Sequence, residues 1–225
     1  MEKKFLLTRR IGSATRNLFI NFCLKLILPI FILTLALTFT ACGERINIDP
    51  DIPAYNIGDI GPGGGIIFYR SETGFNLYTG STAWDNTYIT AHYLEVAPAA
   101  STEFTSIEWG ASGMDVIGTG VGIGYGRRNT KIIAAFLESN SESDKAAQLC
   151  NSLTVEGQTD WFLPSLAELN ELYKSKDVVG GFSTGHYWSS SESDSDFAYM
   201  LDFSDGGLGY DSKDSMDSVC AVRAF

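Results

Sequence analysis

The first 41 residues limit what the rest of the chain can fold into, because they have the order of a signal segment. An uncharged apolar run over residues 26–41 follows basic residues at Lys3, Lys4, Arg9, Arg10, Arg16 and Lys25. The run is shorter than the roughly 20 residues that span a bilayer, and Pro29 interrupts it. Basic residues, an apolar run and small residues at its end are typical of a signal peptide that is removed. We therefore predict that residues 1–41 take no part in the folded protein.

The apolar run ends at Phe39-Thr40-Ala41-Cys42. This segment resembles the lipobox of bacterial lipoproteins, with Phe39 in the place where most of them have leucine. The resemblance implies that Cys42 becomes the first residue and carries acyl chains such as palmitate, through which the protein attaches to the membrane. Gly43 after the cysteine is compatible with the outer membrane. We expect a lipid-anchored protein of the bacterial cell envelope, with surface exposure left open; an uncleaved membrane helix is the alternative.

The charge of the chain changes when the signal segment is removed. Residues 1–41 hold six of the 16 basic residues and one of the 27 acidic residues, so 10 basic and 26 acidic residues remain, a net charge of −16. Such a strongly acidic surface repels nucleic acid and anionic lipid headgroups. We expect no nucleic-acid partner, and we expect the acyl chains alone to hold the protein on the membrane.

The 184 residues from Cys42 onward are close in number to a single domain. Residues 42–56 carry charges and prolines with little periodicity, which is typical of a tether, so the domain is predicted over 57–225. Cys150 and Cys220 are the two cysteines left in this exported part. In an oxidising compartment such a pair is expected to form a disulfide.

The pattern of apolar residues predicts strands, then helices, then strands. The expected strands are 66–69, 93–97, 186–190, 197–203 and 219–225, and the expected helices are 129–138, 144–153 and 165–174. Ser165 and Glu168 have the spacing of a capping box at the start of the third helix. This order indicates an α+β fold with two or three helices on one side of a mostly antiparallel sheet.

Five segments together resemble a known family. They are Gly-Pro-Gly-Gly-Gly-Ile-Ile-Phe-Tyr (61–69), Leu-Glu-Val-Ala-Pro (94–98), Asp-Trp-Phe-Leu-Pro-Ser-Leu-Ala-Glu-Leu (160–169), Tyr-Trp-Ser-Ser-Ser-Glu (187–192) and Val-Cys-Ala-Val-Arg (219–223). The chain resembles the Lcl C-terminal domain family, the adhesin-type domain of a bacterial collagen-like surface protein, over about 57–225. The resemblance implies a non-catalytic adhesion domain with a host glycan or matrix protein as its partner.

More distantly, the layout is similar to C-type lectin-like domains. In those domains a cysteine on the first helix bonds a cysteine on the last strand, and Cys150 and Cys220 occupy these places. Lectin-like domains bind through long loops, which implies contacts from the loops 189–196 and 204–217. Loops on a rigid frame are common recognition sites. The candidate ligand contacts are Glu192, Asp194, Asp196, Asp205, Asp211 and Asp214, with the basic residues Arg127 and Arg128 on a second surface; the alternative is that these are solvated charges without a function.

No sequence motif indicates catalysis, and we expect no cofactor and no metal site. Asp202 and Asp217 add to the loop acids, but their spacing is not that of an EF-hand. Gly181–Gly185 matches G-x-S-x-G by letter, without the strand before and the helix after that this motif needs. Trp84 and Trp109 lie in polar stretches and suit stacking on a sugar ring, whereas Trp161 and Trp188 are expected in the core. A structural or assembly protein of the envelope is the second hypothesis, and an enzyme is the third.

Overall fold

The fold is taken from a computed structural model, which describes residues 54–98 and 104–225. The predicted signal segment, Cys42 and nearly all of the predicted tether lie outside the described residues. The described residues belong to one compact unit. Among them, no helix is both long enough and apolar enough to cross a bilayer.

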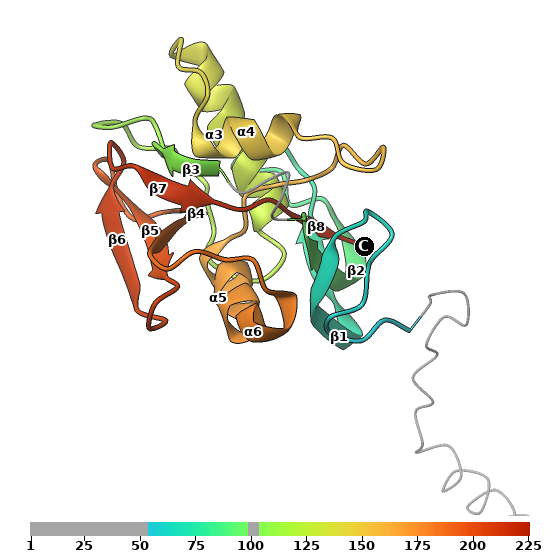
Figure 1. The fold of residues 1–225 in the computed structure, drawn as a ribbon. Helices are drawn as coiled ribbons and strands as arrows, with labels where there is room; N and C mark the ends of the chain where they lie inside the picture. Colours follow the sequence, from blue (N-terminus) through green and yellow to red (C-terminus); the bar gives the residue numbers. More distant parts are fainter. Residues whose placement is uncertain (1–53, 99–103) are drawn as a thin grey trace, which may run out of the picture. The chain divides into compact units, whose positions relative to one another are not determined.

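The first of two sheets joins the beginning of the domain to its end. Its strands are β1 (Ile66–Tyr78), β2 (Tyr88–Val96) and β8 (Val222–Ala224). They lie in the order β1-β2-β8 and all pairings are antiparallel, so the last strand pairs beside the first hairpin (Figure 1). The predicted strands at 66–69 and 93–97 are confirmed, and β1 extends well beyond its predicted end.

The second sheet is built mainly from the C-terminal third of the chain. Its order is β3-β7-β4-β5-β6, and the bounds are β3 (Phe104–Ile107), β4 (His186–Glu192), β5 (Phe197–Asp202), β6 (Leu208–Ser212) and β7 (Asp217–Val219). The β4–β7 pairing is parallel and the others are antiparallel. The segment predicted as a loop over 204–217 therefore contains a strand, β6, which forms an edge of the sheet.

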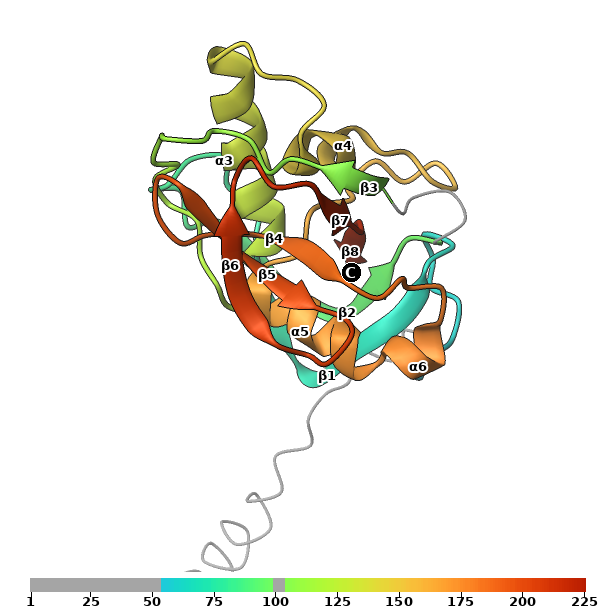
Figure 2. The same ribbon diagram turned by 60° about the vertical axis from the view of Figure 1, so that its left-hand side comes forward.

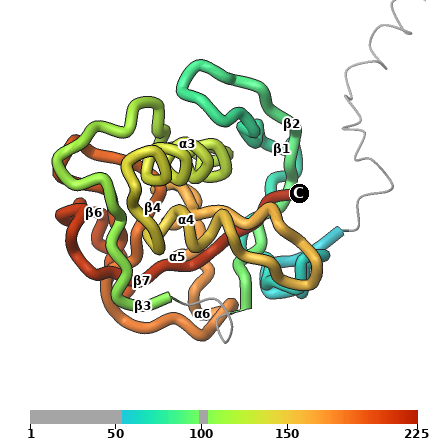
Figure 3. The backbone as a smooth tube through the Cα atoms, turned by 90° about the horizontal axis from the view of Figure 1, so that it is seen from above, coloured from blue at the N-terminus to red at the C-terminus, as the bar shows by residue number. Residues whose placement is uncertain are grey.

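Four helices are present in the described residues: α3 (Gly126–Ser139), α4 (Ala146–Ser152), α5 (Leu166–Lys174) and α6 (Lys176–Val179). Helix α3 contacts β1 and β4, and α5 contacts β1, β4 and β5. Both helices thus touch both sheets, as the views in Figures 2 and 3 show. The α+β class is confirmed, but the expectation of helices on one side of one sheet is wrong. The C-type lectin-like fold stays a prediction.

Three tryptophans anchor the core that these elements share. Trp109, Trp161 and Trp188 belong to one buried cluster with residues of α3 and α4. The indole of Trp109 donates to the carbonyl oxygen of Ser189 at 2.8 Å, and that of Trp188 donates to Ile107 O at 2.8 Å. The expectation that Trp161 and Trp188 are core residues is confirmed. The expectation that Trp109 could stack on a sugar is wrong, because its ring is fully buried against β4.

The glycine-rich segment 61–65 wraps around one buried carboxylate. Glu95 on β2 accepts from the backbone N–H of Gly63 at 3.1 Å and of Gly65 at 3.2 Å, and from Arg223 Nη1 at 2.8 Å. Arg223 also donates from Nε to Asp160 Oδ1 at 2.5 Å. Four of the five family-like segments therefore meet at this ion pair, where they hold the first sheet together.

A second glycine-rich segment, 118–126, is held by a buried glutamate rather than left loose. Glu168 accepts from Gly124 N and from Ser165 N, each at 2.7 Å, and the predicted capping box with Ser165 is present at the start of α5. A Cβ on Gly124 would come within 1.9 Å of Asn76 O, so only glycine fits there. Burial raises the pKa of Glu168 to about 7 against the opposing effect of these hydrogen bonds.

Cys150 on α4 and Cys220 beside β8 lie close together in the core. The thiol of Cys150 is 3.9 Å from the carbonyl oxygen of Cys220. The two cysteines predicted to pair are thus neighbours, and their disulfide stays a prediction. Burial, followed by the proximity of Cys220, raises the pKa of the Cys150 thiol well above its usual value.

Candidate functional site

Three of the predicted contact residues shape the turns of the second sheet. Asp194 Oδ1 accepts from the backbone N–H of Asp196 and of Phe197, both at 2.9 Å. Asp205 Oδ1 accepts from Gly207 N at 2.8 Å. All three carboxylates are exposed, so they can meet a ligand. The hydrogen bonds of Asp194 and Asp205 already explain their presence as turn residues, and Asp196 Oδ2 accepts from Ser195 Oγ at 3.3 Å.

Glu192 is a correction to the predicted contact set. Its Oε1 lies 2.6 Å from Nζ of Lys213, whose side chain is fully buried, and it also accepts from Val116 N at 2.7 Å. Lys213 Nζ donates to Met114 O at 2.8 Å and lies over the ring of Trp109. The glutamate is therefore part of the interior, because the polar segment after β6 turns its lysine inward to meet it.

The basic cluster is also taken up by contacts within the domain. Arg128 is buried and donates to Asn86 Oδ1 at 2.8 Å and to Gly118 O at 2.9 Å. Arg127 pairs with Asp160 at 3.8 Å. Of the two interpretations left open above, pairing within the protein is the one that the structure supports, and Arg128 is not available to an outside anion.

The loop between β1 and β2 presents a tryptophan to solvent. Trp84 is 86% exposed, the most exposed of the large hydrophobic residues described. The loop is held at its base, where Thr79 N donates to Thr87 O at 2.9 Å, and on the side that leads into β2, where Asn86 accepts from Arg128. The buried arginine thus fixes a loop whose ring faces outward.

The Trp84 loop packs against the second glycine-rich segment. A Cβ on Gly118 would lie 2.3 Å from the Cβ of Ala83, so the two backbones are in close contact here. Ile117, which precedes Gly118, is 70% exposed. Two apolar side chains, Trp84 and Ile117, are therefore displayed on adjoining loops, which we call the Trp84 surface.

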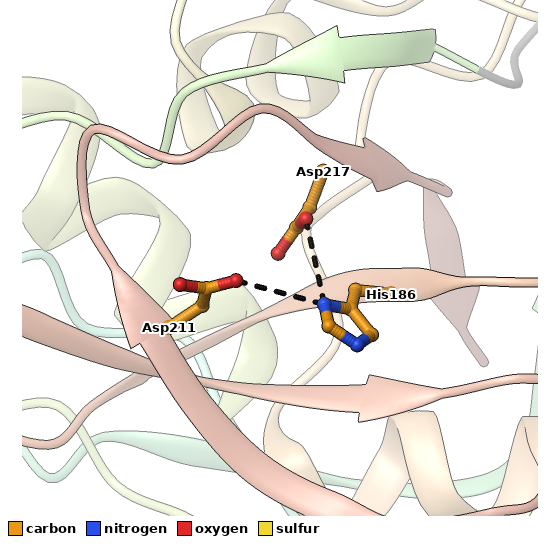
Figure 4. Close-up of side chains that lie close together, drawn as sticks. All are labelled: His186, Asp211 and Asp217. Carbon is orange, nitrogen blue, oxygen red and sulfur yellow. Dashed lines mark ion pairs between the residues drawn. The ribbon is translucent and has the colours of Figure 1, made fainter.

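A second cluster of polar groups lies on the other sheet, where three strands place acids around a histidine on a fourth. Nδ1 of His186 lies 3.5 Å from Asp211 Oδ2 and 3.8 Å from Asp217 Oδ1. Its Nε2 lies 3.8 Å from Oδ2 of Asp202, the residue opposite it on β5. Figure 4 shows the side chains of Asp211 and Asp217 directed toward the same ring nitrogen. We call His186, Asp211 and Asp217 the His186 cluster.

The carboxylates of the His186 cluster differ in their surroundings. Asp211 Oδ1 accepts from Ser212 N at 2.7 Å and from Ser215 Oγ at 2.8 Å, which leaves Oδ2 to face the histidine. Asp217 is 9% exposed, and its Oδ2 has no hydrogen-bond partner among residues 54–98 and 104–225. Burial, with the repulsion of Asp211, raises the pKa of Asp217 to about 6, although His186 acts in the opposite direction.

Two acids of this cluster are predicted from the sequence, but not their proximity to each other or to His186. Asp211 is among the predicted contacts and Asp217 among the loop acids, whereas His186 directly follows the G-x-S-x-G match and is part of no predicted site. The remaining predicted acid, Asp214, is exposed and accepts from Ser112 Oγ at 2.9 Å. The cluster depends on the parallel pairing of β4 with β7, at Tyr187 and Ser218, and no local pattern predicts that pairing.

Comparison with known proteins identifies the family. The Lcl C-terminal domain model matches residues 100–223. This range includes the hairpins β4–β5 and β5–β6 but not the family-like segments 61–69 and 94–98. No curated protein matches. A solved structure, that of a fimbrial protein from Bacteroides ovatus ATCC 8483, is similar with a TM-score of 0.48 and 15% identity, covering 72% of this chain and 44% of that chain. The chain thus spans less than half the length of that protein. On the family match, this chain belongs to the Lcl C-terminal domain family.

Proposed function

We propose that this protein is a lipid-anchored surface protein of the bacterial envelope whose domain binds a glycan without catalysis, in the manner of an adhesion protein. Its membership in the Lcl C-terminal domain family supports a surface or adhesion-type role. The signal segment and the lipobox-like sequence at Cys42 support the anchor.

The observation that carries the proposal is the exposure of Trp84. An indole that is 86% exposed contributes little to the stability of the fold, because it buries almost none of its apolar surface. Tryptophan is enriched among residues that dominate binding energy, and its flat face suits the apolar face of a sugar ring. A loop held in place by Arg128 loses little freedom on binding, which favours affinity.

The charge of the chain indicates which glycans suit this surface. With a net charge of −16 from Cys42 onward, the protein repels sulfated or other polyanionic sugars at long range. The basic residues that could have attracted them, Arg127 and Arg128, are engaged by Asp160, Asn86 and Gly118. We therefore propose a neutral glycan.

A panel of neutral and sulfated glycans, applied to the purified full chain, tests the proposal. Trp84→Ala should lower the affinity for the bound neutral glycan by at least about 30-fold, the loss of a binding hot spot of about 2 kcal/mol. Tyr210→Ala is the matched control, since Tyr210 is an exposed aromatic residue (61%) on β6. An unchanged affinity in Trp84→Ala would contradict the Trp84 surface as the site.

The segments 189–196 and 204–217, which include the acidic turns and strand β6, are the second candidate surface. Tyr210 and Phe197 stack edge to face across β5 and β6 with ring centroids 5.3 Å apart, and both are exposed beside the acidic turns. A loss of binding in Tyr210→Ala, with Trp84→Ala unaffected, would place the ligand there. A chain that binds neither glycans nor matrix proteins would favour the hypothesis of a structural or assembly protein.

The anchor is tested separately from the ligand. Mass spectrometry of the mature protein should find Cys42 as the first residue, with acyl chains attached. Protease treatment of intact cells should degrade the domain if it faces outward and spare it if it faces the periplasm. A mature chain that still carries residues 1–41, or an unmodified Cys42, would contradict the lipoprotein proposal.

A further inference from the structure

We propose that the His186 cluster binds one divalent transition-metal ion of the zinc type, held by His186 Nδ1 and by the carboxylates of Asp211 and Asp217. This inference goes beyond glycan binding and does not depend on the Trp84 surface. It starts from three side chains on three strands, β4, β6 and β7, whose ligand atoms all lie within 4.8 Å of one another.

The spacing of the ligand atoms already approaches that of a coordination shell. Nδ1 of His186 is 3.5 Å from Asp211 Oδ2 and 3.8 Å from Asp217 Oδ1. Ligands about 2.1 Å from a tetrahedral zinc ion lie roughly 3.4 Å apart. These two separations exceed that value by only a few tenths of an ångström, a shift that small side-chain rotations can supply.

The buried oxygen of Asp217 points to a missing partner. Its Oδ2 is shielded from solvent and accepts no hydrogen bond from the described residues, and such a group is destabilising when nothing compensates for it. In Figure 4 the carboxylate is directed into the space between His186 and Asp211. A cation at that place would satisfy this oxygen and relieve the repulsion between the two carboxylates.

The surroundings are those of a positioned metal site. Serine hydrogen bonds hold Asp211 so that Oδ2 faces the histidine. Asp202 lies at the other ring nitrogen, Nε2, where a carboxylate typically orients a metal-bound imidazole. The side chains of His186 and Asp211 are 39% and 35% exposed, so an ion can enter and a water molecule or an outside ligand can complete its shell.

The ligand types select the metal. Calcium and magnesium favour all-oxygen sites, whereas an imidazole nitrogen with two carboxylates suits zinc and its neighbours in the first transition row. The thiols of Cys150 and Cys220 are the soft alternative for zinc, but both are buried in the core. Variants of His186 and of Cys150 distinguish these two possible zinc sites.

The experiment measures zinc binding to the purified full chain after removal of metals, by calorimetry and by metal analysis of dialysed protein. We expect about one zinc per chain and a rise in melting temperature on adding zinc. His186→Gln and Asp217→Asn should each weaken binding by at least about 100-fold, and Asp202→Asn by about 10-fold, as an orienting residue does. Circular dichroism checks that each variant is folded.

Matched controls keep the result attributable to this cluster. His92→Gln removes the other histidine of the chain, and Asp196→Asn removes an exposed turn acid, so both variants should bind zinc as the unaltered chain does. Equal binding in folded His186→Gln, or binding lost only in Cys150→Ser, would overturn the proposal. Absence of zinc, manganese and nickel binding at ion concentrations up to about 1 mM would also overturn it. None of these outcomes bears on glycan binding through Trp84.

Discussion

Lys213 Nζ lies 2.6 Å from Oε1 of Glu192, and this ion pair is enclosed by the domain, with exposed fractions of 0% and 10% for the two side chains. Removal of one partner of such a pair leaves the other charge buried and uncompensated. We predict that Lys213→Met lowers the free energy of unfolding by about 3 to 5 kcal/mol, as measured by urea denaturation.

The control for this prediction is an ion pair of similar length on the surface. Lys174 and Glu171 on α5 are 2.7 Å apart, with exposed fractions of 56% and 29%. Lys174→Met should change the free energy of unfolding by less than about 1 kcal/mol. Similar losses in Lys174→Met and Lys213→Met would show that burial does not govern the effect.

The segment around Glu95 leads to a steric prediction. A Cβ on Gly63 would come within 2.6 Å of Glu95 Oε1 and 3.1 Å of the Trp161 ring. Gly63→Ala should therefore destabilise the domain by about 1 to 3 kcal/mol, the usual range for overpacking, in thermal denaturation. Gly122→Ala adds its methyl at an ordinary 3.5 Å from Tyr125 and should be nearly neutral.

The buried Glu168 predicts a dependence of stability on pH. Its pKa is raised from 4.5 to about 7 in the folded protein, so the folded state binds the proton more tightly than the unfolded chain does. This group therefore makes its full contribution below about pH 4.5 and loses it as the pH rises to about 7. The predicted loss is about 3 kcal/mol between these limits.

Denaturation curves at about pH 5 and about pH 8 measure this effect. In Glu168→Gln the side chain no longer titrates, so the difference between the two pH values should shrink by the part that Glu168 contributes. The variant is also expected to be less stable at both pH values. An amide has one accepting oxygen where the carboxylate has two, so it cannot accept from both Gly124 N and Ser165 N. An undiminished pH difference in the variant would contradict the prediction.

The neighbouring cysteines give a redox prediction. We expect Cys150 and Cys220 to join after export, because they lie together in the core and the periplasm is oxidising. The bond should raise the free energy of unfolding by about 4 kcal/mol in the chain-entropy model. Mass spectrometry of protein purified without reductant should show the loss of two hydrogens, and both thiols reacting with an alkylating agent under denaturing conditions would count against the bond.

Local features of the fold were predictable from the sequence and long-range pairings were not. The capping box at Ser165 and the apolar face of α5 follow from spacing alone, and both are present. Strand β6 is not predicted from the sequence. Its apolar residues, Leu208 and Tyr210, face solvent, so the strand lacks the buried apolar face on which such a prediction depends. The division into two sheets depends on which strands pair across more than 100 residues, as β2 and β8 do.

The candidate sites show the same limit. Trp84 was recognisable as an aromatic residue in a polar stretch, yet Trp109 has a similar sequence context and lies in the core with an exposed fraction of 0%. Glu192 resembled the other acids near the turns, and only the inward position of Lys213 distinguishes it. The His186 cluster needs three strands in register before its residues meet.

The first hairpin has a mechanical consequence for a protein held at one end. Strand β1 begins at Ile66, near the point where Tyr55 packs on Tyr93 and Phe225, and it runs to Tyr78 at the base of the Trp84 loop. If the proposed anchor at Cys42 holds the protein, tension between it and a ligand on that loop runs along the backbone of β1 from one end to the other. An extended strand has little length left to gain, so this tension is carried by covalent bonds and does not pull β1 away from β2. Because the unfolding rate governs resistance to force, the domain should stay folded during brief pulls from flowing liquid.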